Sequence, residues 1–216
     1  MRVGILSLGS RGDASTFQAG AVALGFTATA PIKKSAPTLA ELKDFFAHDH
    51  EWLYLGGHFG GRELSNDAGD VTLTFHADRI ELASGKESAT LRRGSADLGV
   101  VPRLVLWGGC STLGNNQLVA DLGVLFGAHA MLGFRDVTGW KMVDAALGKG
   151  FLAGKKHFFT RVAADSTPAV LTDAWMQTAK LGWGGGTEEH RFAAVDDTGQ
   201  RWVLRDGRVV KDKKLF

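Results

Sequence analysis

Residues 52–61, WLYLGGHFGG, join an uninterrupted apolar run to a glycine pair, a histidine and, one residue later, two further glycines. Residues 104–110, LVLWGGC, repeat this arrangement with a cysteine in place of the histidine. Apolar runs of about four to eight residues are typical of strands that a sheet buries on both faces. The two stretches therefore predict two core strands, one leading to His58 and the other to Cys110.

The segments around these two strands alternate between strand and helix patterns. Further strands are expected at residues 2–8, 26–32 and 129–134, and helices near 14–24, 38–47, 113–127, 139–154 and 168–181. This alternation indicates βαβ units and a mostly parallel central sheet flanked by helices. Two antiparallel additions are expected, a β-meander inserted at about residues 70–94 and a C-terminal hairpin at about 190–210. We expect a single α/β domain over residues 1–216.

Composition and charge exclude several classes of protein. Of 216 residues, 44% are apolar, and 25 basic against 23 acidic residues give a formal charge of only +2, which does not favour nucleic-acid binding. No run of about 18 apolar residues predicts a membrane span, and residues 1–8 do not resemble a signal peptide. Cys110 is the single cysteine, so the chain has no internal disulfide. We therefore expect a cytoplasmic protein without nucleic-acid or membrane partners.

The carboxyl ends of parallel strands lie on one edge of a sheet, which is where such folds bind ligands. If the strands leading to His58 and Cys110 are neighbours, about 5 Å apart, the imidazole and the thiol are within reach of each other. A thiol attacks a carbonyl as the thiolate. Both His58 and the start of a helix that Ser111 or Thr112 caps would favour that form. Cys110 is thus a candidate nucleophile.

The His58 and Cys110 stretches resemble the caspase-like cysteine peptidases, which include legumains, gingipains, separases and bacterial CHAT domains. In that family an apolar strand ending in His-Gly is followed about 50 residues later by one ending in a small residue and cysteine. Here the separation is 110 − 58 = 52 residues. Cys110-Ser111-Thr112, followed by a helix and the strand HAMLGF, is similar to the arrangement in CHAT domains and legumains. The resemblance covers roughly residues 1–182.

The resemblance implies a three-layer caspase-like fold and a cysteine endopeptidase that acts on a peptide or protein through an acyl-enzyme thioester. Cys110 would be the nucleophile and His58 the general base or acid, with no third carboxylate, metal or cofactor required. The backbone N–H groups of Phe59, Gly60 and Cys110 are the candidate oxyanion donors.

Two other functions remain open. Phe59 stands where the family has glycine, so a catalytically inactive caspase-like module that binds a peptide or protein is the main alternative. Residues 6–13, LSLGSRGD, resemble the glycine-rich opening of certain sterol and antibiotic glycosyltransferases, which would indicate a nucleotide-dependent transferase. His48-Asp49-His50 could suggest a metal, but this spacing is more typical of a solvated turn.

Charged residues near the two strand ends are candidates for substrate binding. Asp67 and Asp70 follow His58, and Arg135-Asp136 follow the strand after Cys110. An acidic pocket would select lysine or arginine in the substrate, whereas Arg135 would select aspartate or glutamate. Because two acidic residues lie in the loop after His58, the sequence slightly favours an acidic pocket.

Overall fold

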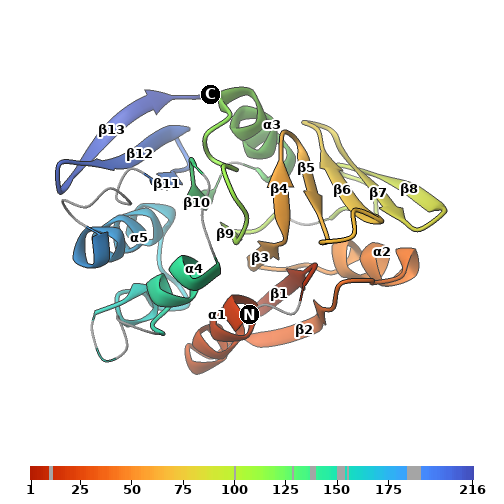
Figure 1. The fold of residues 1–216 in the computed structure, drawn as a ribbon, viewed down its shortest axis with the longest axis horizontal. Helices are drawn as coiled ribbons and strands as arrows, with labels where there is room; N and C mark the ends of the chain where they lie inside the picture. Colours follow the sequence, from red (N-terminus) through yellow and green to blue (C-terminus); the bar gives the residue numbers. More distant parts are fainter. Residues whose placement is uncertain are drawn as a thin grey trace.

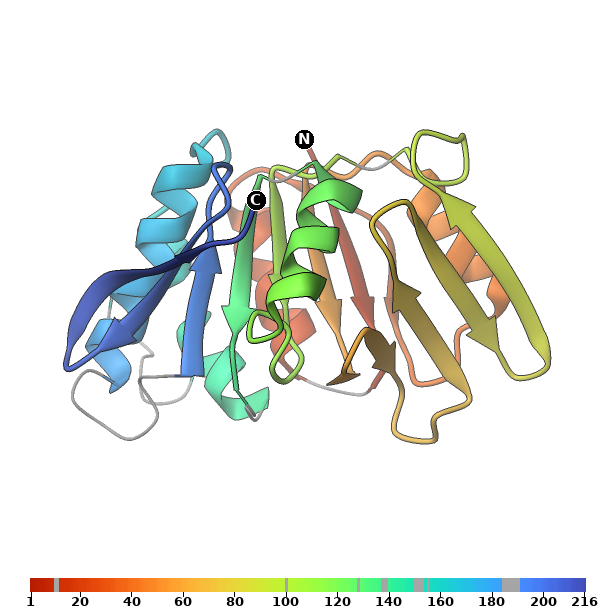
Figure 2. The same ribbon diagram turned by 90° about the horizontal axis from the view of Figure 1, so that it is seen from above.

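The computed structural model describes residues 1–9, 12–99, 101–127, 129–136, 140–149, 154, 156–183 and 191–216. Within these residues the central sheet has eight strands, in the order β13-β12-β11-β10-β9-β3-β1-β2. Its parallel part consists of β1 (Arg2–Ser7), β2 (Thr27–Lys33), β3 (Trp52–Gly56), β9 (Leu104–Trp107) and β10 (Ala130–Phe134). Figure 2 shows β1, β3 and β10 pointing toward the same edge of the molecule. The predicted mostly parallel sheet is confirmed.

Helices cover both faces of this sheet (Figure 1). One face carries α1 (Gly12–Ala23), α4 (Trp140–Ala146), the short 3-10 helix Phe158–Thr160 and α5 (Pro168–Trp183). The other face carries α2 (Leu39–Ala47), α3 (Asn116–Phe126) and a second, smaller sheet. The chain therefore folds as a three-layer α/β structure, with one hydrophobic cluster on each side of the central sheet.

The smaller sheet is antiparallel and, in the described part of the chain, has five strands. They are β4 (His58–Gly60), β5 (Glu63–Ser65), β6 (Val71–Phe75), β7 (Arg79–Ser84) and β8 (Glu87–Arg92). The β-meander predicted at about residues 70–94 is confirmed as β6, β7 and β8, and the sheet also includes β4 and β5, so that it begins at His58. β4 and β5 have three residues each and bury one side chain each, Phe59 and Leu64, so neither shows a recognisable alternation.

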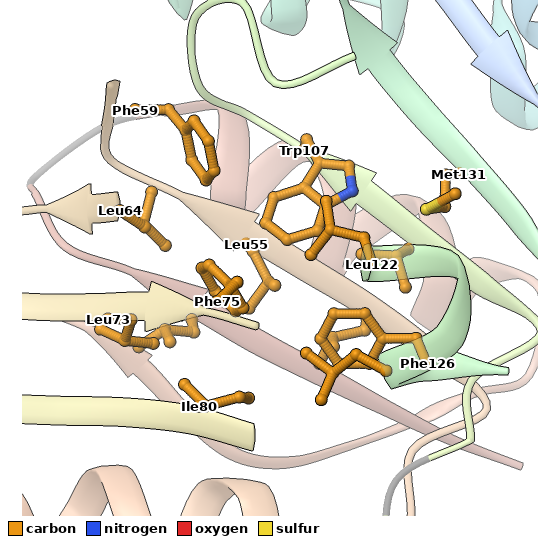
Figure 3. Packing of buried hydrophobic residues seen from close by; sticks show 14 of the residues in the cluster. Leu55, Phe59, Leu64, Leu73, Phe75, Ile80, Trp107, Leu122, Phe126 and Met131 are labelled. Carbon is orange, nitrogen blue, oxygen red and sulfur yellow. The ribbon is translucent and has the colours of Figure 1, made fainter. Parts of the chain in front are cut away.

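Aromatic side chains pack between the smaller sheet and the central sheet (Figure 3). The Trp107 ring lies edge-on to Phe59 and to Phe75, with centroid distances of 5.6 and 5.3 Å. Phe126 of α3 packs against Phe75 and Trp107 in the same cluster. Side chains of this size contribute several kcal/mol each when buried. The position of β4 relative to β9 is therefore fixed by the core.

The C-terminal strands extend the central sheet at one edge. β11 (Phe192–Val195) pairs antiparallel with β10, and β12 (Gln200–Arg205) and β13 (Arg208–Lys214) follow as a hairpin. Asp206 and Gly207 both have positive φ, 48° and 70°, the geometry that a two-residue type I′ turn requires. The predicted hairpin is confirmed and extends four residues further than expected.

Two predicted helices differ from the observed ones. α3 begins at Asn116, and its cap is Asn115, whose side chain accepts a hydrogen bond from the backbone N–H of Leu118. The expectation that Ser111 or Thr112 caps this helix was wrong, since a turn closed by a hydrogen bond from Gly114 N–H to Ser111 O intervenes. α4 ends at Ala146 instead of near residue 154, and residues 150–153 of that prediction lie outside the described part.

Candidate functional site

Three adjacent parallel strands bring three of the predicted site residues to one edge of the sheet. β3 pairs with β9 and β9 pairs with β10, both in parallel register. His58 follows β3, Cys110 follows β9 and Arg135 follows β10, each within three residues of the end of its strand. The neighbouring strands on which the candidate dyad depends are therefore confirmed.

The glycine pairs of the two stretches allow the strand ends to pack closely. A Cβ added to Gly56 would lie 2.7 Å from the Tyr54 ring, and one added to Gly108 would lie 2.1 Å from the Tyr54 hydroxyl. A Cβ on Gly109 would lie 2.8 Å from the Cβ of Phe59 and 3.2 Å from the carbonyl oxygen of Gly57. The segment that carries Cys110 is thus in contact with the segment that carries His58.

Cys110 is half-buried at the start of a tight turn. The next residue, Ser111, has φ of +55°, a left-handed conformation that is uncommon for residues other than glycine. Two hydrogen bonds hold the turn against the chain after β10: Ser111 N–H donates to Asp136 O at 3.0 Å, and Leu113 N–H donates to Phe134 O at 2.8 Å. A non-glycine residue in such a conformation needs this support and is frequent at functional sites.

His58 is exposed at the edge of β4 and contacts a carboxylate. Its Nε2 lies 2.7 Å from Oδ1 of Asp67, with side chains 58% and 74% exposed. Asp67 belongs to the turn between β5 and β6, which Asn66 organises by donating to Ser35 O and Asp70 Oδ1 and by accepting from Val71 N–H. The structure thus places Asp67 against His58, the candidate base. Asp70 instead accepts a hydrogen bond from Asn66 within the β5–β6 turn.

Phe59 directs its side chain into the core. The residue is 8% exposed, and its ring packs on Phe75 and Trp107. Its size therefore anchors β4, which explains why a large residue follows the histidine here. Gly60 pairs with Glu63 across β4 and β5. The oxyanion role of the Phe59, Gly60 and Cys110 backbone groups stays a prediction.

A pocket with a volume of about 320 Å³ adjoins this edge. It is lined by Phe59, Gly61, Ser111, Gly114, Asn115 and Arg135. Two of these residues, Phe59 and Ser111, directly follow His58 and Cys110 in sequence, and neither candidate lines the pocket itself. A smaller hollow of about 120 Å³ lies between α5 and the C-terminal strands and contains no predicted site residue.

Arg135 is the charged residue of this pocket. Burial lowers the pKa of its guanidinium, as do the nearby charges of Arg205 and Arg201, and Asp212 and Asp136 act in the opposite direction. Asp212 is shared, since its Oδ2 accepts from Arg201 at 2.5 Å and its Oδ1 accepts from Arg205 at 2.5 Å. The surroundings of the pocket therefore contain three arginines and two carboxylates, those of Asp212 and Asp136.

The other predicted substrate-binding residues lie elsewhere. Neither Asp67 nor Asp70 is among the residues that line the pocket. Asp136 is exposed and contacts the Cys110 turn through its backbone carbonyl. Of the charged residues predicted for substrate binding, Arg135 is the one that lines the pocket.

No group of metal ligands is found among the described residues. His48 lies at the end of α2, but His50 is buried, with Nε2 3.0 Å from Phe45 O. Burial lowers the pKa of His50, although its backbone contact acts in the opposite direction. The expectation of a solvated turn was therefore wrong for His50, which is a core residue that packs on Gly4.

The glycine-rich segment 6–13 was the basis for the alternative of a nucleotide-dependent transferase. Two of its residues, Ser10 and Arg11, lie outside the described part of the chain.

Sequence reasoning missed two residues that shape the site. Tyr54 is buried under both glycine pairs, and the shared Gly-Gly motif, which leaves room for a large neighbour, was the available signal. Asn66 positions Asp67, and the run Asn66-Asp67-Ala68-Gly69-Asp70 has the composition of a turn. In both cases the sequence pattern was visible, but the residue that it contacts in the folded chain was not.

Over the described residues, no helix is both long enough and apolar enough to cross a membrane. Comparison with known protein families, with curated proteins and with solved structures finds no match.

Proposed function

We propose that the protein is a cysteine endopeptidase of caspase-like type in which Cys110 is the nucleophile and His58 the general base and acid. The observation that carries the proposal is the direct parallel pairing of β3 with β9, which brings the two residues to the same edge of the sheet. The contact of Gly109 with Gly57 and Phe59 supports it, because it joins the two strand ends. The pocket that Phe59 and Ser111 line provides room for a substrate side chain.

The reaction would proceed in two steps. The Cys110 thiolate attacks the carbonyl carbon of the scissile peptide bond, and the C–N bond breaks to leave a thioester. The leaving amine takes its proton from the His58 imidazolium. His58 then removes a proton from water, whose oxygen attacks the thioester, and the C–S bond breaks to give a carboxylic acid, the Cys110 thiolate and the protonated His58 with which the cycle began.

Asp67 gives His58 a defined orientation in this scheme. An Nε2–H donated to Asp67 leaves the lone pair of the neutral ring on Nδ1, so Nδ1 is the nitrogen that would exchange protons with the thiol and the leaving amine. Because the pair is exposed, this contribution is small.

A peptide library tests the proposal. The native chain and Cys110→Ala are each incubated with a mixture of peptides, and new termini are identified by mass spectrometry. We expect cleavage by the native chain alone, with the thioester adduct of Cys110 detectable at low pH. Peptides that bind both chains and are cleaved by neither would support the alternative, an inactive binding module, and would overturn the proposed function.

A further inference from the structure

We propose that the smaller hollow between α5 and the C-terminal strands binds a primary alkylammonium group, carried by a free amine or by a lysine side chain. This α5 pocket has a volume of about 120 Å³. Its lining includes three residues of α5 and three of the C-terminal segment: Thr172, Asp173, Met176, Asp196, Trp202 and Val209. The lining thus combines two carboxylates, a hydroxyl and an aromatic ring.

The α5 pocket is separate from the candidate peptidase site. Cys110 follows the carboxyl end of β9, and β10 runs parallel to β9. β11 runs antiparallel to β10 and begins at Phe192, beside Phe134 at the end of β10. Asp196 directly follows the far end of β11, at the opposite edge of these strands from Cys110. The proposed ammonium site is therefore independent of the peptidase reaction.

The size of the α5 pocket limits its ligand to a few atoms. Its volume corresponds to about four water molecules of about 30 Å³ each. Pockets for drug-sized molecules measure about 300–1,000 Å³. A lysine side chain or a short alkylamine fits this space, whereas a nucleotide does not.

Asp196 supplies a negative charge to the pocket. Burial would raise its pKa, but hydrogen bonds from the side chains of Thr198 and Trp202, and from two backbone N–H groups, lower it below the ordinary value. The carboxylate is therefore ionised at neutral pH. These donors are all uncharged, so among the described residues no cation is hydrogen-bonded to Asp196. A cationic ligand would compensate its charge.

The hydrogen bonds of Asp196 favour an ammonium over a guanidinium. Its Oδ1 accepts from Thr198 N–H, from the Thr198 hydroxyl and from Gln200 N–H, at 3.0, 2.6 and 3.1 Å. In the described part of the chain, Oδ2 accepts one hydrogen bond, from Trp202 Nε1 at 2.8 Å. A guanidinium pairs with both oxygens of a carboxylate, whereas an ammonium is a compact charge that can use one. The remaining acceptor position of Oδ2 therefore suits an ammonium.

A buried hydroxyl in the same lining lacks a partner. Thr172 is 4% exposed, and among the described residues its Oγ1 accepts and donates no hydrogen bond. Buried hydroxyls nearly always have a partner, so we expect a ligand atom to supply it here. Thr172 lies in the second turn of α5, beyond the first turn, where the helix dipole would repel a cation. The three N–H donors of an ammonium match this hydroxyl and the two carboxylates.

The rest of the lining suits an alkyl chain. Met176 of α5 is fully buried, and Trp202 of β12 and Val209 of β13 are half-buried. Side chains of this kind pack against the stem of a lysine or an alkylamine while its charged end reaches polar groups. The pocket thus has an apolar wall for the stem and acceptors for the ammonium.

Basic residues lie around the α5 pocket, but among the described residues none lines it. Lys211 Nζ lies 5.4 Å from the centroid of the Trp202 ring, which shows that this ring attracts an ammonium. Lys156 and Arg161 line a separate hollow that shares Asp173 with the pocket. The positive charges therefore lie outside the pocket and the negative charges line it.

The test follows the indole N–H resonance of Trp202 by ¹⁵N NMR, which Trp202→Phe identifies by its disappearance. The first probes are n-butylammonium, n-butylguanidinium and n-butanol, each added at constant ionic strength. We expect n-butylammonium to shift the resonance saturably and to bind at least about tenfold more tightly than the other two. Nα-acetyl-lysine methylamide, with and without acetylation of Nε, then tests a lysine residue as the source of the ammonium.

Variants of the lining separate binding from folding. Asp196→Asn should weaken n-butylammonium binding at least about tenfold, because a charge-assisted hydrogen bond is lost. Thr172→Val should weaken it about threefold or more and should leave the Tm unchanged or higher, since it removes an unpaired buried hydroxyl. Asp197→Asn is the matched control, because it removes the same charge at an exposed position outside the lining. It should bind like the native chain.

The outcomes decide between the alternatives. Equal affinities for n-butylammonium and n-butanol, or tighter binding of n-butylguanidinium, would overturn the proposal. A folded Thr172→Val variant that binds like the native chain would overturn it as well. Binding of the free amine without the lysine derivative would identify a small amine as the ligand, and binding of the lysine derivative that Nε-acetylation abolishes would identify a lysine residue. Either result supports an ammonium site, and neither depends on Cys110.

Discussion

The two Gly-Gly pairs are alike in sequence and in their surroundings, yet the backbone follows a different course after each pair. Gly56 and Gly108 both face the Tyr54 ring, and Gly57 and Gly109 both face the smaller sheet. At Gly57 the chain bends, and it then enters β4 of the smaller sheet with His58 exposed. After Gly109 it turns sharply through residues 110–114, with Ser111 at positive φ.

The two ends also differ in the contacts that hold the functional side chain. The turn that holds Cys110 is bound to β10 by backbone hydrogen bonds and is supported by Arg201, which donates to Leu113 O at 2.9 Å and to Asn116 Oδ1 at 3.0 Å. The His58 side chain is held by an exposed contact with Asp67. We therefore expect changes at the cysteine end to alter stability, and changes at the histidine end to alter rate.

The largest effect is expected at His58. His58→Ala should lower the kcat/KM of peptide cleavage by about 10²–10⁴-fold, the usual contribution of a general acid–base group. Its Tm should hardly change, since the side chain is 58% exposed. His76→Ala serves as the control, because His76 pairs with Glu81 in the smaller sheet. Equal activity of the two variants would remove His58 from the mechanism.

Gly109→Ala should destabilise the cysteine end. The added methyl would meet the Cβ of Phe59 and the backbone of Gly57, and overpacking of this kind costs about 1–3 kcal/mol. Gly99→Ala is the matched control, since a Cβ there meets nothing within 4 Å and the change in unfolded-state entropy is the same. Urea unfolding measures both variants. Indistinguishable midpoints would contradict the close contact between the strand ends.

Low pH should destabilise the cysteine end, because it protonates Asp212, the carboxylate that binds Arg201. Its pKa in the folded chain lies below the ordinary 3.8, so the carboxylate stabilises the fold above that value and this contribution is lost as pH falls through the lowered pKa. The stability difference between the native chain and Asp212→Asn should therefore be largest near pH 6 and should shrink below about pH 3.8. Urea midpoints at pH 6, 4 and 3 provide the measurement, and a difference that is constant with pH would contradict the assignment.

Asp67→Asn should have the smallest effect. Exposed ion pairs contribute about 0.2–1 kcal/mol, which corresponds to a loss in kcat/KM of at most about fivefold. Raising the salt concentration should reduce the difference from the native chain, since salt screens the pair. Glu63→Gln, another exposed acid of the smaller sheet, is the control. A loss as large as that of His58→Ala would show that Asp67 does more than orient the ring.

Much of the fold followed from local patterns. The continuous apolar runs of β3 and β9 predicted buried parallel strands, and both are buried throughout. The capping box of Thr38 and Glu41 marked the start of α2, and the structure contains both of its hydrogen bonds. Asp206-Gly207 predicted the final turn. Each of these features depends on residues close together in sequence.

What sequence reasoning missed depends on contacts between distant segments. The strands β4 and β5 owe their existence to the burial of Phe59 and Leu64 against the central sheet, which three-residue segments do not reveal. The cap of α3 moved to Asn115 because the turn after Cys110 bonds to the end of β10. The pairing of Asp67 with His58 likewise required the β5–β6 turn to fold back.

Alkylation of Cys110 tests the central claim most directly, because the chain has a single cysteine and intact mass assigns the label without ambiguity. Iodoacetamide rates between pH 5 and 9 are measured for the native chain, for His58→Ala and for the urea-unfolded chain. If His58 and Cys110 form a working pair, the native thiol at neutral pH reacts faster than the unfolded one, and His58→Ala loses this advantage. A native rate equal to or below the unfolded rate, and unchanged by the His58 substitution, would contradict the account.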